Sequence, residues 1–203
     1  MFGCRQTSNQ YLLNSLGNKG EYKPSFTDKQ ELLTYQVHPT WKIDVLGNYA
    51  RNSYKLVPED RETAFGHIKE AYQLKIYFDG QEIDRFDTWF GAVTSTYTPT
   101  SDVQLKLIAS AYQSFERENY DIQGQYWIGK LETDLGTDDF GEVVESKGVG
   151  TYLNHARNRL NATVYSIEHQ GIKEKDFSFL QWGIKFQHEA FEDRMREWEM
   201  IDS

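Results

Sequence analysis

The sequence predicts an all-β fold built as an antiparallel meander of long strands, and three observations support this. Residues 85–117 contain two arms of alternating polarity joined by turn-forming residues at 98–102, as in a β-hairpin. The alternation lasts nine or more residues, whereas a globular strand has about five or six and a membrane-crossing strand about 9 to 11. The apolar residues of the second arm fall on one face: Val103, Leu105, Leu107, Ala109 and Ala111.

Two further hairpins are expected on either side of the central one. The first covers residues 28–50 with a turn at 38–40, and the third has arms at 152–169 and 177–190. Its second arm alternates clearly, with Leu180, Trp182, Ile184 and Phe186 on one face and Gln181, Gly183, Lys185 and Gln187 on the other.

The segments between the hairpins lose this alternation. Residues 51–84, with a small hairpin near Asp79–Gly80, and residues 118–148 are therefore predicted to be long loops. Residues 9–26 are predicted to be the end of a strand and a long loop, because glycine, asparagine and proline gather there. The expected plan has short turns at one end of the sheet and long loops at the other.

Composition narrows the class of protein. A net charge of −9 argues against a nucleic-acid surface, and the absence of an apolar run near 18 residues excludes a transmembrane helix. The strands of a membrane barrel alternate lipid-facing and lumen-facing residues, so they average out as hydrophilic. Thirteen Tyr, twelve Phe and five Trp suit β structure or an interface. Cys4, the one cysteine, is expected to be an inert thiol.

The polar faces of the expected strands carry more charge than a soluble core could bury unpaired. The charged residues concerned are Lys42, Asp44, Lys106, Arg157, Arg159 and Lys185. A water-filled lumen removes this cost, and Trp41, Tyr97 and Phe177 lie beside the short turns, where an aromatic girdle is expected. The sheet is therefore predicted to form part of a large transmembrane β-barrel with short periplasmic turns and long extracellular loops.

Six strings of residues also carry a resemblance to a known family. They are SYKLVPEDRETAFG (53–66), IYFDGQEIDRFDTWFGA (76–92), YDIQGQYW (120–127), GVGTYLNHARNRLNATVYSIEHQG (148–171), LQWGIKFQHE (180–189) and EWEMIDS (197–203). In this order they resemble the barrel portion of TonB-dependent outer-membrane receptors of the Bacteroidetes type. The similarity covers the chain from about residue 9 to residue 203.

This resemblance implies that residues 1–203 form one partial barrel domain of about six or seven strands, from a barrel of about 22 strands that holds a plug. Such a receptor lies in the outer membrane of a Gram-negative bacterium and imports a ligand captured by its extracellular loops. The implied partners are outer-membrane lipid, the remainder of the barrel and plug domain, the TonB complex through an N-terminal part, and a small ligand such as a siderophore, glycan or peptide. The sequence contains no plug domain, TonB box, signal peptide or terminal aromatic strand, and both ends look cut.

Three groups of residues are candidates for binding. Five aromatics of the expected loops could stack on a sugar or siderophore, although packing of loop on loop explains them equally well: Tyr54, Tyr77, Phe78, Tyr126 and Trp127. Arg157, Arg159 and Lys185 are candidates for charges facing the lumen or the plug, with ion pairing inside the wall as the favoured alternative. Asp134, Asp138, Asp139 and Glu142 form a weak Ca²⁺ candidate without EF-hand spacing, and a solvated acidic loop is the favoured interpretation.

The sequence has no HExxH, GxSxG, P-loop or CxxC motif, so neither an enzyme nor a cofactor is predicted. An alternative from a different class is a soluble β-sandwich or barrel that acts as a binding module in the periplasm or outside the cell. The two hypotheses differ in the apolar faces, which a soluble fold buries in a core. A barrel section instead predicts a curved open sheet with its apolar band uncovered, and therefore exposed side chains at Trp182 and Ile184.

Overall fold

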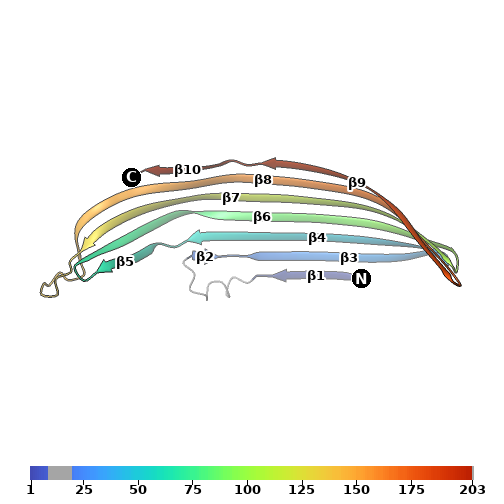
Figure 1. Cartoon of the computed structure of the whole chain (residues 1–203), viewed down its shortest axis with the longest axis horizontal. Coiled ribbons are helices and arrows are strands. Elements are labelled where there is room, and N and C mark those ends of the chain that lie inside the picture. The colour runs from blue at the N-terminus through green and yellow to red at the C-terminus, as the bar shows by residue number, and fades with distance from the viewer. Residues whose placement is uncertain (9–19, 203) are drawn as a thin grey trace.

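The computed structural model describes residues 1–8 and 20–202, and these form a single antiparallel sheet (Figure 1). The all-β prediction is confirmed for this part of the chain. Residues 9–19, which belong to the segment predicted as a strand end and a loop, lie outside the described residues. The ten strands are β1 (Phe2–Thr7), β2 (Gly20–Tyr22), β3 (Ser25–His38), β4 (Trp41–Pro58), β5 (Arg61–His67), β6 (Glu70–Thr100), β7 (Val103–Leu131), β8 (Val143–Lys175), β9 (Ser178–Arg194) and β10 (Glu197–Asp202).

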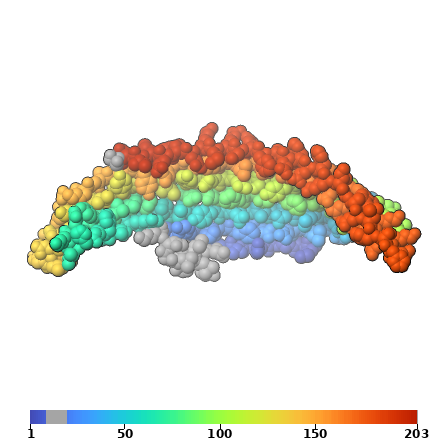
Figure 2. All heavy atoms as spheres, viewed as in Figure 1, coloured from blue at the N-terminus to red at the C-terminus, as the bar shows by residue number. Residues whose placement is uncertain are grey.

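These strands lie in seven lines, because three of them continue the line of another strand. The order across the sheet is β1-β3-β4-β6-β7-β8-β10, while β2 pairs with the far end of β4, β5 with the far end of β6, and β9 with β8. Neighbouring lines are antiparallel and follow the sequence, as the colour order in Figure 2 shows. The meander prediction is confirmed, and seven lines agree with the expected six or seven strands. The two chain ends lie at opposite edges of the sheet (Figure 1).

The three short turns lie where the sequence predicts them. β3 and β4 are joined by residues 39–40, β6 and β7 by residues 101–102, and β8 and β9 by residues 176–177. The third turn is tighter than the predicted residues 170–176, because β8 continues to Lys175. Asp176 takes the left-handed conformation with φ 39°, which aspartate tolerates better than most residues.

The two predicted long loops are wrong, since most of residues 51–84 and 118–148 is strand. The strands β6, β7 and β8 contain 31, 29 and 33 residues, or about 100 Å each at about 3.3 Å per residue. Between β7 and β8 a loop remains only over residues 132–142. Alternation is lost in these segments because both faces there carry polar side chains, so a strand leaves no period of two in the sequence.

The small hairpin predicted at Asp79–Gly80 is also wrong. β6 runs straight through these residues, and the chain instead reverses at residues 68–69, between β5 and β6. Gly80 has φ 101°, and a Cβ atom there would lie 1.8 Å from the backbone oxygen of Asp121. Its glycine therefore serves a close approach between β6 and β7 and not a turn.

The described residues form no hydrophobic core. Leu131, Ala156 and Ala162 are their buried apolar residues, and none of their large side chains is fully buried. Trp182 is 39% exposed and Ile184 73% exposed, as the barrel-section hypothesis predicts. The sheet is a long, open, arched layer (Figure 1). No helix of the described residues is long and apolar enough to cross a membrane.

Candidate lipid-facing surface and inner-face site

The strand register assigns each side chain to one of two faces of the sheet. Directly paired residues on neighbouring strands point to the same face, and successive residues of a strand point to opposite faces. We name the faces the Leu107 face and the Lys106 face after two neighbours on β7. In one register row of the Leu107 face, Leu107 lies beside Ser95 and His169, and these lie beside Ile43 and Ile184.

The Leu107 face carries an apolar band across the end of the sheet nearest the short turns. The predicted apolar faces of β7 and β9 are confirmed, because Leu105 and Leu107 join this band together with Trp182, Ile184 and Phe186. Ser95, His169, His188 and Glu31 interrupt it, although the Ser95 hydroxyl accepts a hydrogen bond from Trp41 Nε1 at 2.9 Å. The larger members of the band are Leu33, Tyr35, Trp41, Ile43, Val45, Tyr49, Trp89, Val93, Tyr97, Leu105, Leu107, Tyr165, Ile167, Trp182, Ile184 and Phe186.

Aromatic rows bound the apolar band on both sides. Trp41, Tyr97 and Trp182 lie in the row beside the short turns. In the opposite row, Tyr49 and Trp89 pack with ring centroids 4.2 Å apart. Eight residue steps separate the two rows along β4, or about 26 Å at 3.3 Å per step. The predicted places of Trp41 and Tyr97 are confirmed, whereas Phe177 lies in the turn itself and is exposed.

On β4 and β6, charges begin one row beyond Tyr49 and Trp89, whereas β3 already carries Lys29 in the Tyr49 row and Glu31 one row inside the band. Asp87 accepts hydrogen bonds from Tyr49 Oη at 3.2 Å and from Arg51 Nε at 2.5 Å, and it pairs with Arg85 at 3.2 Å. Partial burial raises the pKa of Asp87, but the bonds from Arg51 and Tyr49 outweigh it and hold this pKa below its usual range. On β4 and β6 the Leu107 face therefore changes from apolar to ionic within one pair of rows.

The Lys106 face is polar at the level of the apolar band. Lys42 pairs with Asp44 at 3.0 Å, and Asp44 also accepts a hydrogen bond from Thr34 Oγ1 at 2.7 Å. Lys185 lies opposite Glu168 on β8. This agrees with the polar face predicted from Lys42, Asp44, Lys106 and Lys185.

Arg157 and Arg159 are placed differently from the prediction, which grouped them with Lys185. They lie on the Leu107 face, because Arg159 pairs with Arg117 and Arg194, while Lys185 lies on the opposite face. The grouping fails because it assumes that a face keeps one polarity along the whole strand. On β8 the same face carries Ile167 inside the apolar band and Arg159 beyond it.

The five aromatics predicted in loops all lie in strands, and the structure divides them between the faces. Tyr77 and Trp127 lie on the Leu107 face and line an open hollow of about 630 Å³ together with Val149, Thr151 and Asp202. Tyr54, Phe78 and Tyr126 lie on the Lys106 face. A single stacking site made by all five is therefore excluded.

On the Lys106 face the aromatics form two contact groups. Phe78 meets Tyr152 edge-on at 6.4 Å, with the Arg61 guanidinium 5.6 Å from the centroid of the Phe78 ring. Tyr54 lies 6.2 Å from Tyr22. Phe78 thus contacts both a cation and a second aromatic ring, and such a group suits a sugar or another planar ligand.

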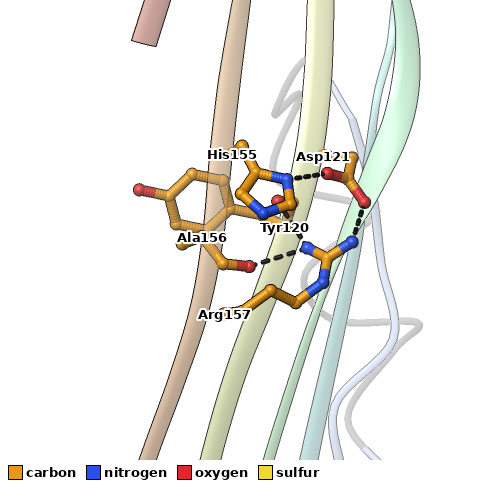
Figure 3. Close-up of polar contacts among 5 residues, drawn as sticks. All are labelled: Tyr120, Asp121, His155, Ala156 and Arg157. Atoms are coloured by element: carbon orange, nitrogen blue, oxygen red, sulfur yellow. Dashed lines mark hydrogen bonds and ion pairs between the residues drawn. The ribbon is translucent and has the colours of Figure 1, made fainter. Parts of the chain in front are cut away.

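Sequence reasoning missed a polar network on the Leu107 face (Figure 3). Asp121 on β7 accepts hydrogen bonds from Arg157 and from His155 Nδ1, the latter at 2.5 Å. Arg157 also donates to the backbone oxygens of Tyr120 at 3.1 Å and Ala156 at 2.7 Å. The hydrogen bond from Arg157, aided by that from His155, holds the pKa of Asp121 below its usual range. The spacing of two residues between His155 and Arg157 places them on one face, but only the register between β7 and β8 reveals Asp121.

Three carboxylates lie together on the Lys106 face, beyond the level of the apolar band. Glu82, Asp84 and Glu118 each offer an oxygen within 4.8 Å of the others, and they are the only set of three or more possible metal ligands in the described part of the chain. Burial, and then the neighbouring carboxylates, raises the pKa of Glu82 and of Asp84. One oxygen of Asp84 is buried and accepts no hydrogen bond from any described residue. Hard oxygen donors of this kind suit a divalent cation.

The predicted Ca²⁺ candidates lie in the loop at residues 132–142, and their oxygens do not meet in such a set. Backbone contacts organise this loop instead: Asp134 Oδ1 accepts from the Gly136 amide at 2.9 Å, and Glu132 Oε1 accepts from the Asp134 amide at 2.9 Å. These are local turn bonds of the kind that aspartate and glutamate make in loops without a metal. The geometry gives no support to calcium at Asp134, Asp138, Asp139 and Glu142.

No family model matches the chain, and neither does any curated protein.

Proposed function

We propose that this chain is a section of the wall of a large outer-membrane β-barrel, of the TonB-dependent receptor kind that it resembles, and that this receptor imports a small ligand. The observation that carries the proposal is the apolar band of the Leu107 face. The band extends about 26 Å along the strands, or about 20 Å in height at a tilt of 40°, which is close to the hydrophobic belt of a membrane barrel at about 25 Å, and aromatic rows lie at both of its borders. Behind it, the Lys106 face carries ion pairs suited to a wet lumen.

The energetics of the sheet support lipid contact. Each large apolar side chain of the band contributes about 1.5–3 kcal/mol when it leaves water, yet Val93, Ile167 and Ile184 stay 46%, 49% and 73% exposed within the chain. Lipid would cover them without a second protein layer. The alternative of a soluble β-sandwich needs such a layer, whereas the described residues form one sheet.

Closure of the barrel supplies what the sheet edges lack. The outer sides of β1 and of β9 and β10 face no other strand of the described chain, and unpaired edges are costly in lipid. In the proposed barrel, further strands pair with both edges. Lipid, the rest of the barrel with its plug, and the TonB complex are accordingly the proposed partners.

Ligand capture is assigned to the part of the sheet that extends beyond the band. On β6 this extension runs from Thr88 back to Glu70, about 60 Å at 3.3 Å per residue, so the wall itself takes the place of the long loops expected from the sequence. Its Lys106 face carries the ring and cation of Phe78 and Arg61, with Tyr152 at the side. A siderophore, glycan or peptide with a flat face fits this chemistry.

The five tryptophans provide a direct test, because all of them lie on the Leu107 face and they occupy four heights, with Trp41 and Trp182 in one row. Trp41, Trp89 and Trp182 belong to the band, while Trp198 and Trp127 lie beyond it, about 26 Å and 46 Å past the Trp89 row along the strands. Variants that keep one tryptophan each are reconstituted in bilayers whose acyl chains carry bromine, a short-range quencher of tryptophan fluorescence. We expect strong quenching at Trp41, Trp89 and Trp182 and little at Trp127. Equal quenching at Trp182 and Trp127 would refute the lipid-facing band.

A further inference from the structure

Arginines from four neighbouring strands lie in a single register row, two rows beyond the Trp89 row that borders the apolar band. Arg85 on β6 pairs with Arg117 on β7, which pairs with Arg159 on β8, which pairs with Arg194 on β9. We call these four residues the arginine row, and all of them lie on the Leu107 face. Like charges directly opposite on neighbouring strands repel one another. Anions close to the row would therefore stabilise the sheet.

The chain supplies anions only to the two ends of the row. Arg85 pairs with Asp87 at 3.2 Å, and Arg194 pairs with Glu192. The two central residues, Arg117 and Arg159, are exposed and make no ion pair with any described residue.

The nearest acids in sequence cannot reach the centre of the row. Glu116 and Glu118 flank Arg117 on β7, so both point to the Lys106 face. There, Glu118 meets Glu82 and Asp84. At the centre of the row the sheet thus separates charge, with Arg117 and Arg159 on the Leu107 face and Glu116 and Glu118 behind them.

The height of the row matches the polar margin of a bilayer. It lies four residue steps beyond Trp89, about 13 Å along the strand or about 10 Å in height at a tilt of 40°. The headgroup region adds about 5–8 Å to each side of the hydrocarbon core. Arginine side chains that bend back along the strand cover the remaining distance.

We propose that the arginine row binds the phosphate groups of anionic lipid headgroups and thereby fixes the depth of the sheet in the membrane. The proposal rests on the proposed function, because it requires that the Leu107 face contact lipid. A guanidinium group forms paired hydrogen bonds with a phosphate, and the spacing of neighbouring strands lets two arginines share one headgroup. Phosphate between Arg117 and Arg159 would also remove their repulsion.

The test compares two variants that lose the same charge on opposite faces. Arg117→Gln/Arg159→Gln removes the centre of the row, and Lys106→Gln/Lys185→Gln is the matched control. Protein extracted from membranes in neutral detergent is titrated with phosphatidic acid or with phosphatidylcholine, and bound lipid is counted by native mass spectrometry. Each basic side chain near an anionic lipid contributes about fivefold to binding. We therefore expect about 30-fold weaker binding of phosphatidic acid by the arginine variant and no change in the control.

Further arms separate the possible failures. Arg117→Lys/Arg159→Lys should restore most of the affinity, because it keeps the charge and loses only the paired geometry. Unchanged affinity in the arginine variant would overturn the proposal, as would displacement of the lipid by millimolar inorganic phosphate, which would indicate a site for the free ion. Strong bromine quenching at Trp89 together with unchanged lipid selectivity would refute the arginine row only. Absent quenching at Trp89 would refute the proposed function as well.

Discussion

The apolar band and the extension beyond it are parts of the same strands, yet their faces follow different rules. On β6, Val93 and Ile83 are both exposed aliphatic residues of the Leu107 face, ten residues apart. Val93 lies among Val45, Ala109 and Ile167, whereas Ile83 lies beside Lys55 and Asn119. The polarity of a face is therefore a property of height along the sheet and not of the strand. This is the pattern that a change of solvent at a membrane surface would impose.

The largest effect is expected when an arginine is introduced, in two separate variants, inside the band and beyond it. Val93→Arg puts a cation at the middle of the band, which costs about 2–4 kcal/mol where a barrel residue faces the centre of a bilayer. Ile83→Arg makes the same change on the same strand and face but outside the band, so we expect a change within about 0.5 kcal/mol. Urea unfolding of the protein in lipid vesicles measures both. Equal losses for the two variants would show that the band does not face lipid.

The second comparison concerns two glycines of β6, because the backbone of β7 lies close to Gly80 in the extension and leaves space at Gly91 in the band. A Cβ at Gly80 would lie 1.8 Å from the Asp121 backbone oxygen at φ 101°, whereas a Cβ at Gly91 in the band meets nothing within 4 Å. Gly80→Ala should therefore cost about 2 kcal/mol, from the strained conformation and the shift that the clash requires. Gly91→Ala is the control and should be nearly neutral. Similar unfolding midpoints for the two variants would contradict the tight pairing of β6 with β7 at Gly80.

How far sequence reasoning reaches differs between the two regions for the same physical cause. In the band, the face that contacts lipid or a core must be apolar. The alternation of Leu105, Leu107 and Trp182 with polar residues therefore predicts both the strands and the face to which these side chains point. In the extension both faces are polar, and β6 through Asp79 therefore resembles a loop. Alternation also fixes a face only relative to its own strand. Whether Arg159 and Lys185 share a face depends on how β8 pairs with β9, and the alternation within each strand does not determine that register.

Sites made by residues of two strands could not be predicted from the sequence, for a related reason. His155 and Arg157 are visible as a pair on one strand, but Asp121 is 34 residues from His155 and meets it only through the pairing of β7 with β8. The Glu82, Asp84 and Glu118 set arises in the same way from β6 and β7. The acids that the sequence groups most closely, at residues 134–142, instead belong to a turn that makes its own hydrogen bonds.

The Asp121 network gives a smaller effect with a distinct pH dependence. Since Arg157 and His155 lower the pKa of Asp121 in the folded state, its contribution to stability is present above the unfolded pKa of about 3.9 and is lost as the pH falls through the folded value. Asp121→Asn should cost about 0.5 kcal/mol at pH 7 and low salt, because exposed ion pairs contribute little. The difference from the wild type should disappear as the pH falls through the lowered folded pKa of Asp121, and it should shrink in 0.5 M NaCl. A pH-independent difference would assign the effect to packing instead.

The smallest expected effect is a stabilisation, and it comes from Glu82 on the Lys106 face. The pKa of Glu82 is raised by burial and by Asp84, so its charged form opposes folding. The penalty is present in full above the folded pKa and disappears as the pH falls through it. Glu82→Gln removes the charge and should stabilise the protein at pH 7 by a few tenths of a kcal/mol, about the scale of a screened surface interaction.

Urea unfolding is measured with EDTA present, so that no divalent cation neutralises Glu82, Asp84 and Glu118. Glu62→Gln serves as the control, because Glu62 pairs with Lys75 at 3.5 Å and its loss should destabilise slightly. Destabilisation by both variants would contradict this prediction. It would mean that a cationic side chain of the protein itself stabilises the charged form of Glu82.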